Sequence, residues 1–404
     1  MSNLFSRVST SGAYATTLNN IQSTQVSLSQ LQAQISSGKS ISQPSDNPNG
    51  AAIAESTNSS LIQLSASQGA VQQQLGAMTQ AESTLGSVVS ALQQFRQLAI
   101  QAGSGSNTAS DQASIANQMQ QLRNQILGYA NTTNSASGQA LFGGQGSTKT
   151  PFVDNGSGVT YNGVGGQTNS TATSVPMTLN GQQIFMNVPS GNGVFQITAG
   201  AANTGTAFSD AGTITNPSAL TGNSYSIQFT VAGGNTTYNV VNSTTGATVL
   251  SNQAYTQTTG QTISFDGMSM VVQGTPANGD TLSVAPSSTN NLFNTLDAAI
   301  SNVKNNTGAA LSQGLAQSLA EIDTGLNQVE AGQGLAGTYM NQANAITTAQ
   351  DLNSTQLQTT QSNAQDANMV QVISQYQNES TSFQAALQSY AEIQKLSLFN
   401  YISG

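Results

Sequence analysis

The side chains that most often carry catalysis and metal binding in proteins are missing from this sequence. Its 404 residues include no His and no Cys, so a Ser-His-Asp triad, a Cys-His pair and the usual zinc ligand sets are all excluded. Acid–base chemistry would have to use carboxylates, Lys or Tyr. We therefore predict that the chain is not an enzyme and that it has no catalytic, metal-binding or cofactor-binding residues.

Two local patterns resemble ligand-binding loops. Asp266 and Asp280 stand beside Gly residues, but the spacing of an EF-hand is absent, so turn formation explains these carboxylates better than calcium binding. The Gly-rich sequence GQGLAG at 332–337 lacks both the GKS or GKT ending of a phosphate-binding loop and a preceding strand. We expect a bend or break in a helix at 332–337.

The surface carries very little charge. Charged residues make up 6% of the chain and the net charge is −9. Because the few cations are scattered singly, we expect neither nucleic acid nor a membrane as a partner. A surface of Ser, Thr, Asn and Gln lets subunits pack closely in a polymer with little repulsion; adaptation to an acidic or salty exterior explains it equally. No apolar run approaches the roughly 18 residues of a membrane span, and the first residues lack the apolar region of a signal peptide.

Apolar residues recur at heptad spacing at both ends of the chain. Residues 11–35 place them seven apart, and residues 369–390 place them at steps of three, four or seven. This spacing predicts a helix over 10–37, ended by Gly38, and a terminal helix over 352–396.

The same helical pattern fills the segments next to these ends. Asn47 and Pro48 are typical of an N-cap followed by the first helical position, so they predict a long helix over 50–101. Asp111 belongs in the first turn of a third helix. Helix resumes at about residue 290.

The middle of the chain reads as short strands separated by turns. A Gly-Gly turn at 233–234 lies between two alternating segments. Asp266-Gly267 predicts a two-residue hairpin loop, in which Ile263 and Phe265 face Met270 and Met268.

These patterns predict an α+β fold, in which paired N- and C-terminal segments form a long antiparallel helical rod or coiled coil that carries an inserted β-rich domain. We expect three domains. They are a terminal helical polymerisation domain (1–47 plus 350–404), a helical rod domain (48–150 plus 290–349) and a β-rich outer domain (151–289).

Four segments resemble the flagellin superfamily, and within it the hook-associated protein 3 family. They are QAQISSGKSISQPSDNPNGAAIA (32–54), NTTNSASGQALFGG (131–144), the β-rich segment 263–287 and the ending EIQKLSLFNYI (392–402). The Leu-Ser-Leu-Phe-X-Tyr ending is similar to that of hook-associated protein 3, and the Leu-Leu-Arg type of ending common in flagellin is missing.

The resemblance implies a structural component of the bacterial flagellum, an adaptor at the hook–filament junction that links hook-associated protein 1 to flagellin. The implied partners are those two proteins, a ring of like subunits and a flagellar export chaperone. The implied location is extracellular, after export through the flagellar type III apparatus. A filament flagellin is the alternative within the superfamily. A soluble chemoreceptor-like coiled coil fits the Ala/Gln/Ser-rich helices, but it does not explain the β insertion.

The apolar stripe of the terminal helices is the candidate subunit interface. By periodicity alone, packing within one chain explains this stripe best, whereas the resemblance implies that terminal helices pack between neighbouring subunits, and one stripe can do both. The predicted interface residues are Tyr14, Leu18, Ile21, Leu28, Ile35, Met369, Ile373, Tyr376, Phe383, Leu387, Tyr390, Leu398 and Phe399.

Overall fold

The computed structural model describes residues 10–146, 149–256 and 259–402, with side chains from residue 14 to residue 392 across the same gaps. The chain divides into two compact units. We call residues 1–68 with 347–404 the terminal unit and residues 69–346 the central unit. No helix among the described residues is long and apolar enough to cross a membrane.

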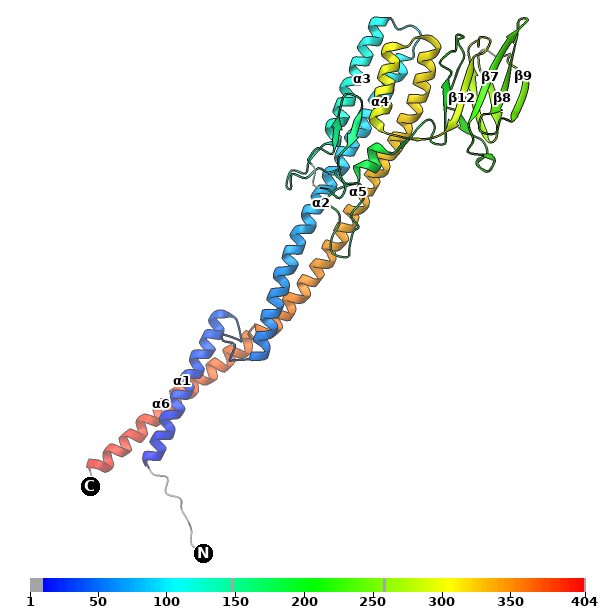
Figure 1. Ribbon diagram of the computed structural model, residues 1–404. Helices are drawn as coiled ribbons and strands as arrows, with labels where there is room; N and C mark the ends of the chain where they lie inside the picture. The colour runs from blue at the N-terminus through cyan, green and yellow to red at the C-terminus, as the bar shows by residue number, and fades with distance from the viewer. Residues whose placement is uncertain (1–9, 147–148, 257–258, 403–404) are drawn as a thin grey trace. The chain divides into compact units, whose positions relative to one another are not determined.

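The described residues form six α-helices, and several of these begin or end at local sequence signals (Figure 1). Gly38 follows α1 with a φ of +71°, and the Asn47 side chain accepts a 3.0 Å hydrogen bond from the Gly50 N–H at the start of α2. Thr108 and Asp111 form a capping box at α3. The helices are α1 (Thr10–Ser37), α2 (Pro48–Ala102), α3 (Ala109–Ala130), α4 (Leu292–Asn305), α5 (Gly308–Gln365) and α6 (Met369–Ile402).

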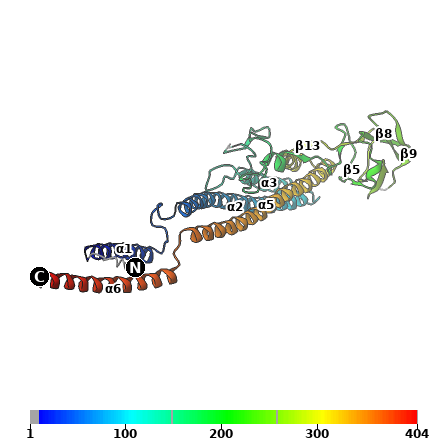
Figure 2. The same cartoon turned by 90° about the horizontal axis from the view of Figure 1, so that it is seen from below.

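In the terminal unit, α1 and α6 lie side by side and antiparallel (Figure 2). Tyr14 near the start of α1 contacts Tyr390 in the last part of α6, and Lys39 just after α1 forms a β-bridge with Asp366 just before α6. The helices therefore run in opposite directions along their whole pairing.

The other helix pair of the terminal unit joins the first turns of α2 to the last turns of α5, and the side chains that it buries most are polar. Thr57 and Gln350 are the side chains buried there, at 5% and 7% exposed. Gln350 donates a 2.8 Å hydrogen bond to Ser67 Oγ, and Gln68 donates one of 3.0 Å to Asp351. Leu61, Leu64 and Leu357 on these helix segments are only half-buried, so this pair gains less hydrophobic stabilisation than a fully buried apolar seam would.

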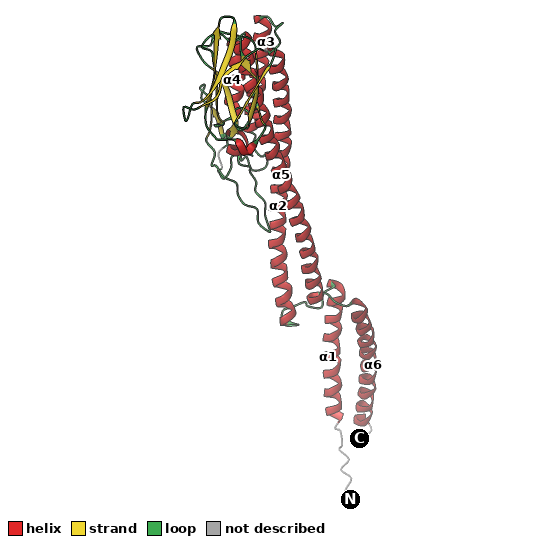
Figure 3. Ribbon diagram, turned by 90° about the vertical axis from the view of Figure 1, so that its right-hand side faces the viewer, coloured by secondary structure: helices red, strands yellow, loops and turns green. Residues whose placement is uncertain are grey.

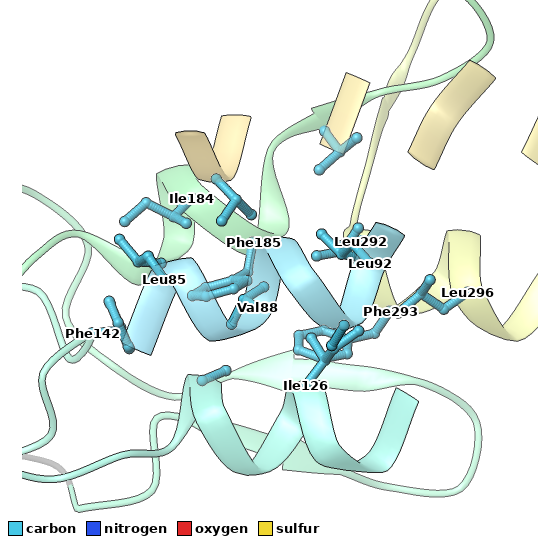
Figure 4. Packing of buried hydrophobic residues seen from close by; sticks show 14 of the residues in the cluster. Leu85, Val88, Leu92, Ile126, Phe142, Ile184, Phe185, Leu292, Phe293 and Leu296 are labelled. Carbon is cyan, nitrogen blue, oxygen red and sulfur yellow. The ribbon is translucent and has the colours of Figure 1, made fainter. Parts of the chain in front are cut away.

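The helices of the central unit share a large apolar core (Figure 4). Leu85, Val88 and Leu92 of α2 meet Ile126 of α3 and Phe293 of α4, and all five are fully buried. α2 and α5 are antiparallel, since Glu82 pairs with Gln333 and Arg96 with Asp323.

The segment that follows α3 packs into this same core. Phe142, Phe152 and Phe185 form edge-to-face ring contacts, and Phe152 and Phe185 also contact Phe293 of α4. The segment contributes the hairpin of β1 (Phe152–Asp154) and β2 (Val159–Tyr161) and the short π-helix η1 (Gln182–Met186). Residues 141–146 and 149–188 thus belong to the helical core by their packing. The three-domain division remains a prediction.

The buried cation Arg123 links three elements of this core, α3, α4 and β1. Arg123 of α3 is 3% exposed and forms two 2.9 Å hydrogen bonds to Asp297 of α4. It also pairs with Asp154 of β1, and it lies 5.8 Å from the centre of the Phe293 ring. Burial opposes the charge of Arg123, but the two carboxylates outweigh burial and raise the pKa of the guanidinium.

A second, separate core lies between two sheets in residues 195–286, which we call the β module (Figure 3). The five-stranded sheet has the order β4-β12-β7-β8-β9, and β11 pairs with β10, β5 and β6 in the other sheet. The strands are β4 (Phe195–Ala199), β5 (Phe208–Ser209), β6 (Thr213–Ile214), β7 (Tyr225–Ala232), β8 (Asn235–Asn242), β9 (Thr248–Ala254), β10 (Gln261–Phe265), β11 (Met268–Gln273) and β12 (Thr281–Pro286), with the 3₁₀ turn η2 (Pro217–Ala219) between β6 and β7. Two short strands, β3 (Val188–Pro189) and β13 (Thr289–Asn290), pair where the chain enters and leaves the module.

Both predicted hairpins are present. Phe265 lies opposite Met268 and Ile263 opposite Met270, and Asp266 has the positive φ that its turn requires, 44°. The predicted α+β class, with helices from both ends of the chain and an inserted sheet domain, is confirmed.

The expected helix break at 332–337 is wrong, because α5 runs through these residues without interruption. Gly332 instead allows close packing, since a Cβ there would lie 2.9 Å from the Ile184 side chain of η1. The glycine is a packing position within a helix.

Candidate subunit interface

Most of the predicted interface residues meet within one chain, along the seam between α1 and α6. Tyr14, Ile21, Leu28 and Ile35 line this seam on α1, seven residues apart. Apart from the exposed Tyr14, their side chains are buried or half-buried. The opposite face of the seam consists of Met369, Tyr376, Phe383 and Tyr390 of α6, which are all half-buried.

The best-defined contact of the seam joins its two tyrosines. The Tyr14 and Tyr390 ring centres are 5.3 Å apart, and the two hydroxyls share a 2.6 Å hydrogen bond. The apolar centre of the seam is small: among the described side chains of the terminal unit, the buried apolar ones are Ile21 and Val372, at 8% and 7% exposed.

Three predicted residues lie outside the seam. Leu18, Ile373 and Leu387 are 37%, 42% and 43% exposed, and each follows a seam residue by four positions. In an antiparallel pair, this heptad position lies on the same side of both helices. The three residues therefore lie on one side of the pair, where Gln25, Gln32 and Ser380 share their heptad position. We call this side the apolar flank.

The described side chains on the opposite side of the pair are polar. Each residue there precedes a seam residue by one position, and the set is Asn20, Ser27, Gln34, Gln375, Ser382 and Ser389. α1 contains no charged residue at all, so another uncharged surface can approach this pair without electrostatic repulsion. The terminal helices thus present one apolar and one polar flank.

The sequence pattern missed Val372, which is buried in the seam. Val372 follows Met369 by three positions, but the next two residues of that heptad position are Glu379 and Ala386. Because the carboxylate of Glu379 interrupts the apolar pattern at this heptad position, the sequence pattern predicted the neighbouring Ile373 and not Val372. Leu398 and Phe399, also predicted, lie in α6 beyond the described side chains.

Exposed apolar side chains are concentrated in the terminal unit, although it holds fewer than a third of the residues. Ile62, Leu352 and Val370 are the most exposed, at 64%, 70% and 81%. Val26 of α1 is 60% exposed. A thin core combined with an apolar exterior is typical of a surface that a protein partner covers.

The two aspartates considered for calcium binding have structural roles. Asp280 is 3% exposed and accepts hydrogen bonds from the backbone N–H groups of Thr204, Gly205 and Ala277 at 2.8–3.0 Å. Asp266 accepts the hydroxyl of Tyr225 at 2.6 Å. In the described part of the chain, no three His, Cys, Asp or Glu side chains gather where they could hold a metal ion.

Comparisons with known proteins identify the family of this chain. The family profile for the bacterial flagellin N-terminal helical region matches residues 8–147. The flagellar junction protein FlgL from Legionella pneumophila is 31% identical; the match covers 72% of this chain and 99% of that one, with a TM-score of 0.67. The flagellar hook-associated protein 3 from Legionella pneumophila is 30% identical over 76% of this chain and 97% of its own, with a TM-score of 0.69.

The chain belongs to the FlgL family of flagellar junction proteins. FlgL from Xanthomonas campestris is also similar, at 27% identity over 76% of this chain and 99% of its own, with a TM-score of 0.67. No curated protein sequence matches the chain. The family is one of structural components of the bacterial flagellum, which confirms the resemblance drawn from residues 32–54, 131–144 and 392–402.

Proposed function

We propose that the protein forms the hook–filament junction of a bacterial flagellum, where a ring of copies links hook-associated protein 1 to flagellin. The observation that carries this proposal is the match to a flagellar junction protein at 31% identity, which covers 72% of this chain and 99% of the matched chain. The protein acts as an adaptor and performs no catalysis.

The terminal unit provides the contact between copies. The seam holds α1 and α6 of one chain together, while Leu18, Ile373 and Leu387 stay exposed on one flank. A neighbouring copy covers this flank. Because the two flanks differ, the contact is head-to-tail, and repetition of such a contact closes into a ring when the rotation between copies allows it.

The thin seam also fits export in a loosely folded state. The protein leaves the cell through the flagellar type III apparatus, accompanied by an export chaperone, and its weakly paired terminal helices gain further stability when neighbours bury the apolar flank. Such coupled folding and assembly is favourable because burial of the flank offsets the entropy lost on ordering.

Deletion of the gene tests the proposal against the filament-flagellin alternative. Loss of a junction protein leaves hooks without filaments and releases flagellin into the medium. Loss of a filament flagellin also leaves bare hooks, but no flagellin is released. Electron microscopy of the cells, combined with flagellin detection in the medium, separates the two outcomes.

A further inference from the structure

The β module and the helices of the central unit do not share a hydrophobic core. The apolar cluster of the helices includes Val188 and resumes at Leu292, whereas the cluster of the module runs from Phe195 to Val284. Two linkers, residues 189–194 and 287–291, join the two cores. Something other than apolar packing must therefore fix the orientation of the module.

The first polar contact is a buried carboxylate of α5. Glu321 is 5% exposed, and its Oε1 accepts a 3.1 Å hydrogen bond from the Gly191 N–H of the first linker. Its Oε2 accepts one of 3.4 Å from Asn290 Nδ2 of the second linker and one of 2.9 Å from the Thr295 hydroxyl of α4. Gln317 donates a further bond of 3.2 Å to Oε1. One side chain thus binds both linkers, and its charge is satisfied by four donors.

The second polar contact lies two turns earlier on α5. Gln313 is 6% exposed, accepts a 2.7 Å hydrogen bond from the Ser209 N–H and donates one of 3.1 Å to the Ile197 carbonyl. Ile197 lies in β4 and Ser209 in β5, so a single amide group holds a strand of each sheet. Eight residues of helix separate the two contacts by about 12 Å.

We propose that Gln313 and Glu321 form a two-point clamp that sets the orientation of the β module on α5. One contact alone would leave rotation about that point, and two contacts about 12 Å apart along a stiff helix remove it. The two linkers act as a hinge between the module and the helices, and the two contacts hold this hinge in one conformation. Gly191 and Gly193 of the first linker have φ values of +62° and +90°, so the backbone there is turn-like and not part of a continuous strand. Released from the clamp, the module stays folded on its own core but changes its angle to the helices.

The absence of Cys makes a direct test simple. Ser251→Cys on β9 and Ser301→Cys on α4 replace exposed side chains on opposite sides of the hinge, and nitroxide labels there report their distance distribution by pulsed electron paramagnetic resonance. In full-length protein we expect one narrow distribution, and at least a twofold broader one after Gln313→Ala with Glu321→Gln. Thr324→Ala, whose hydroxyl bonds only within α5, is the matched control and should leave the width unchanged.

Hydrogen exchange in strands β7 and β8 and in helices α2 and α3 shows whether the module has been released from α5 or has unfolded. The proposal expects both cores to keep their protection while the distance distribution broadens. If the double variant does not fold, the single Gln313→Ala variant provides the test. It removes one of the two contacts and should broaden the distance distribution by itself. A distribution that stays narrow in a folded variant would overturn the clamp.

Discussion

Phe383 and Leu387 lie one helical turn apart on α6, but their side chains have different surroundings. Phe383 is half-buried in the seam against α1, whereas Leu387 is 43% exposed on the apolar flank. We predict that Phe383→Ala weakens the helix pair within one chain and that Leu387→Ala weakens only the contact between copies.

The expected magnitudes follow from burial. Removal of a fully buried Phe side chain costs about 3–5 kcal/mol, so a half-buried one costs about 2 kcal/mol. That loss raises the population of the opened pair about 30-fold. Leu387→Ala changes the opening by about 0.5 kcal/mol or less, as is usual for surface positions. Covering its exposed 43% in the ring is worth about 1 kcal/mol, since full burial of Leu gives about 1.5–3 kcal/mol. This loss recurs at each copy of the ring.

Native-state proteolysis and filament attachment measure the two effects separately. A protease of broad specificity should cleave the terminal helices of the Phe383→Ala monomer about 30 times faster than those of the wild type, because cleavage follows the open population when reclosing is fast. The Leu387→Ala monomer should be cleaved within twofold of the wild-type rate and yet lose filaments under shear. Ser382→Ala on the polar flank is the control for both assays. Equal acceleration by the two apolar variants, or full filament attachment with Leu387→Ala, would refute the separation of seam and flank.

Three further outcomes concern the central unit. Arg123→Met should lower the free energy of unfolding in urea by about 3 kcal/mol, because it leaves carboxylates without their buried partner; a change below about 1 kcal/mol would contradict the role of Arg123. Burial, reinforced by the Asp266 hydrogen bond, raises the pKa of Tyr225 above 10, so its contribution to stability is intact below pH 10 and is lost as the pH rises further; strand unfolding followed by circular dichroism should therefore accelerate only above about pH 10. Gly267→Ala should destabilise the β module by about 2 kcal/mol because a Cβ there would collide with the Asn216 carbonyl, while Gly233→Ala, with φ also positive but open space around it, should cost about 1 kcal/mol in the same melts.

Local signals in the sequence located most of the elements. Gly38 and the Asn47-Pro48 pair fixed the boundary between α1 and α2, because caps depend on the residues beside them. The Asp266-Gly267 hairpin was equally clear, since its turn type demands particular residues at two positions. Such features need no knowledge of distant parts of the chain.

Contacts between distant segments were less predictable. The packing of Phe142 on Phe185, and of Phe185 on Phe293 of α4, involves short segments with no helical or strand period of their own. Glu321 and Gln313 look like ordinary polar residues of an exposed helix face, and only the fold shows that linkers and strands cover them. The heptad period predicted the seam. Val372 was not predicted, because Glu379 occupies the same heptad position one repeat later, and the prediction did not distinguish the seam from the apolar flank.

Direct localisation of the protein on the flagellum tests the junction role most clearly. The turn at Gly233-Gly234 can accept an epitope tag, because open space surrounds both residues, and immunogold labelling then shows where the tagged chain is found. The junction role predicts label confined to a single band between the hook and the filament. Label distributed along the filament, or absent from that band, would contradict it.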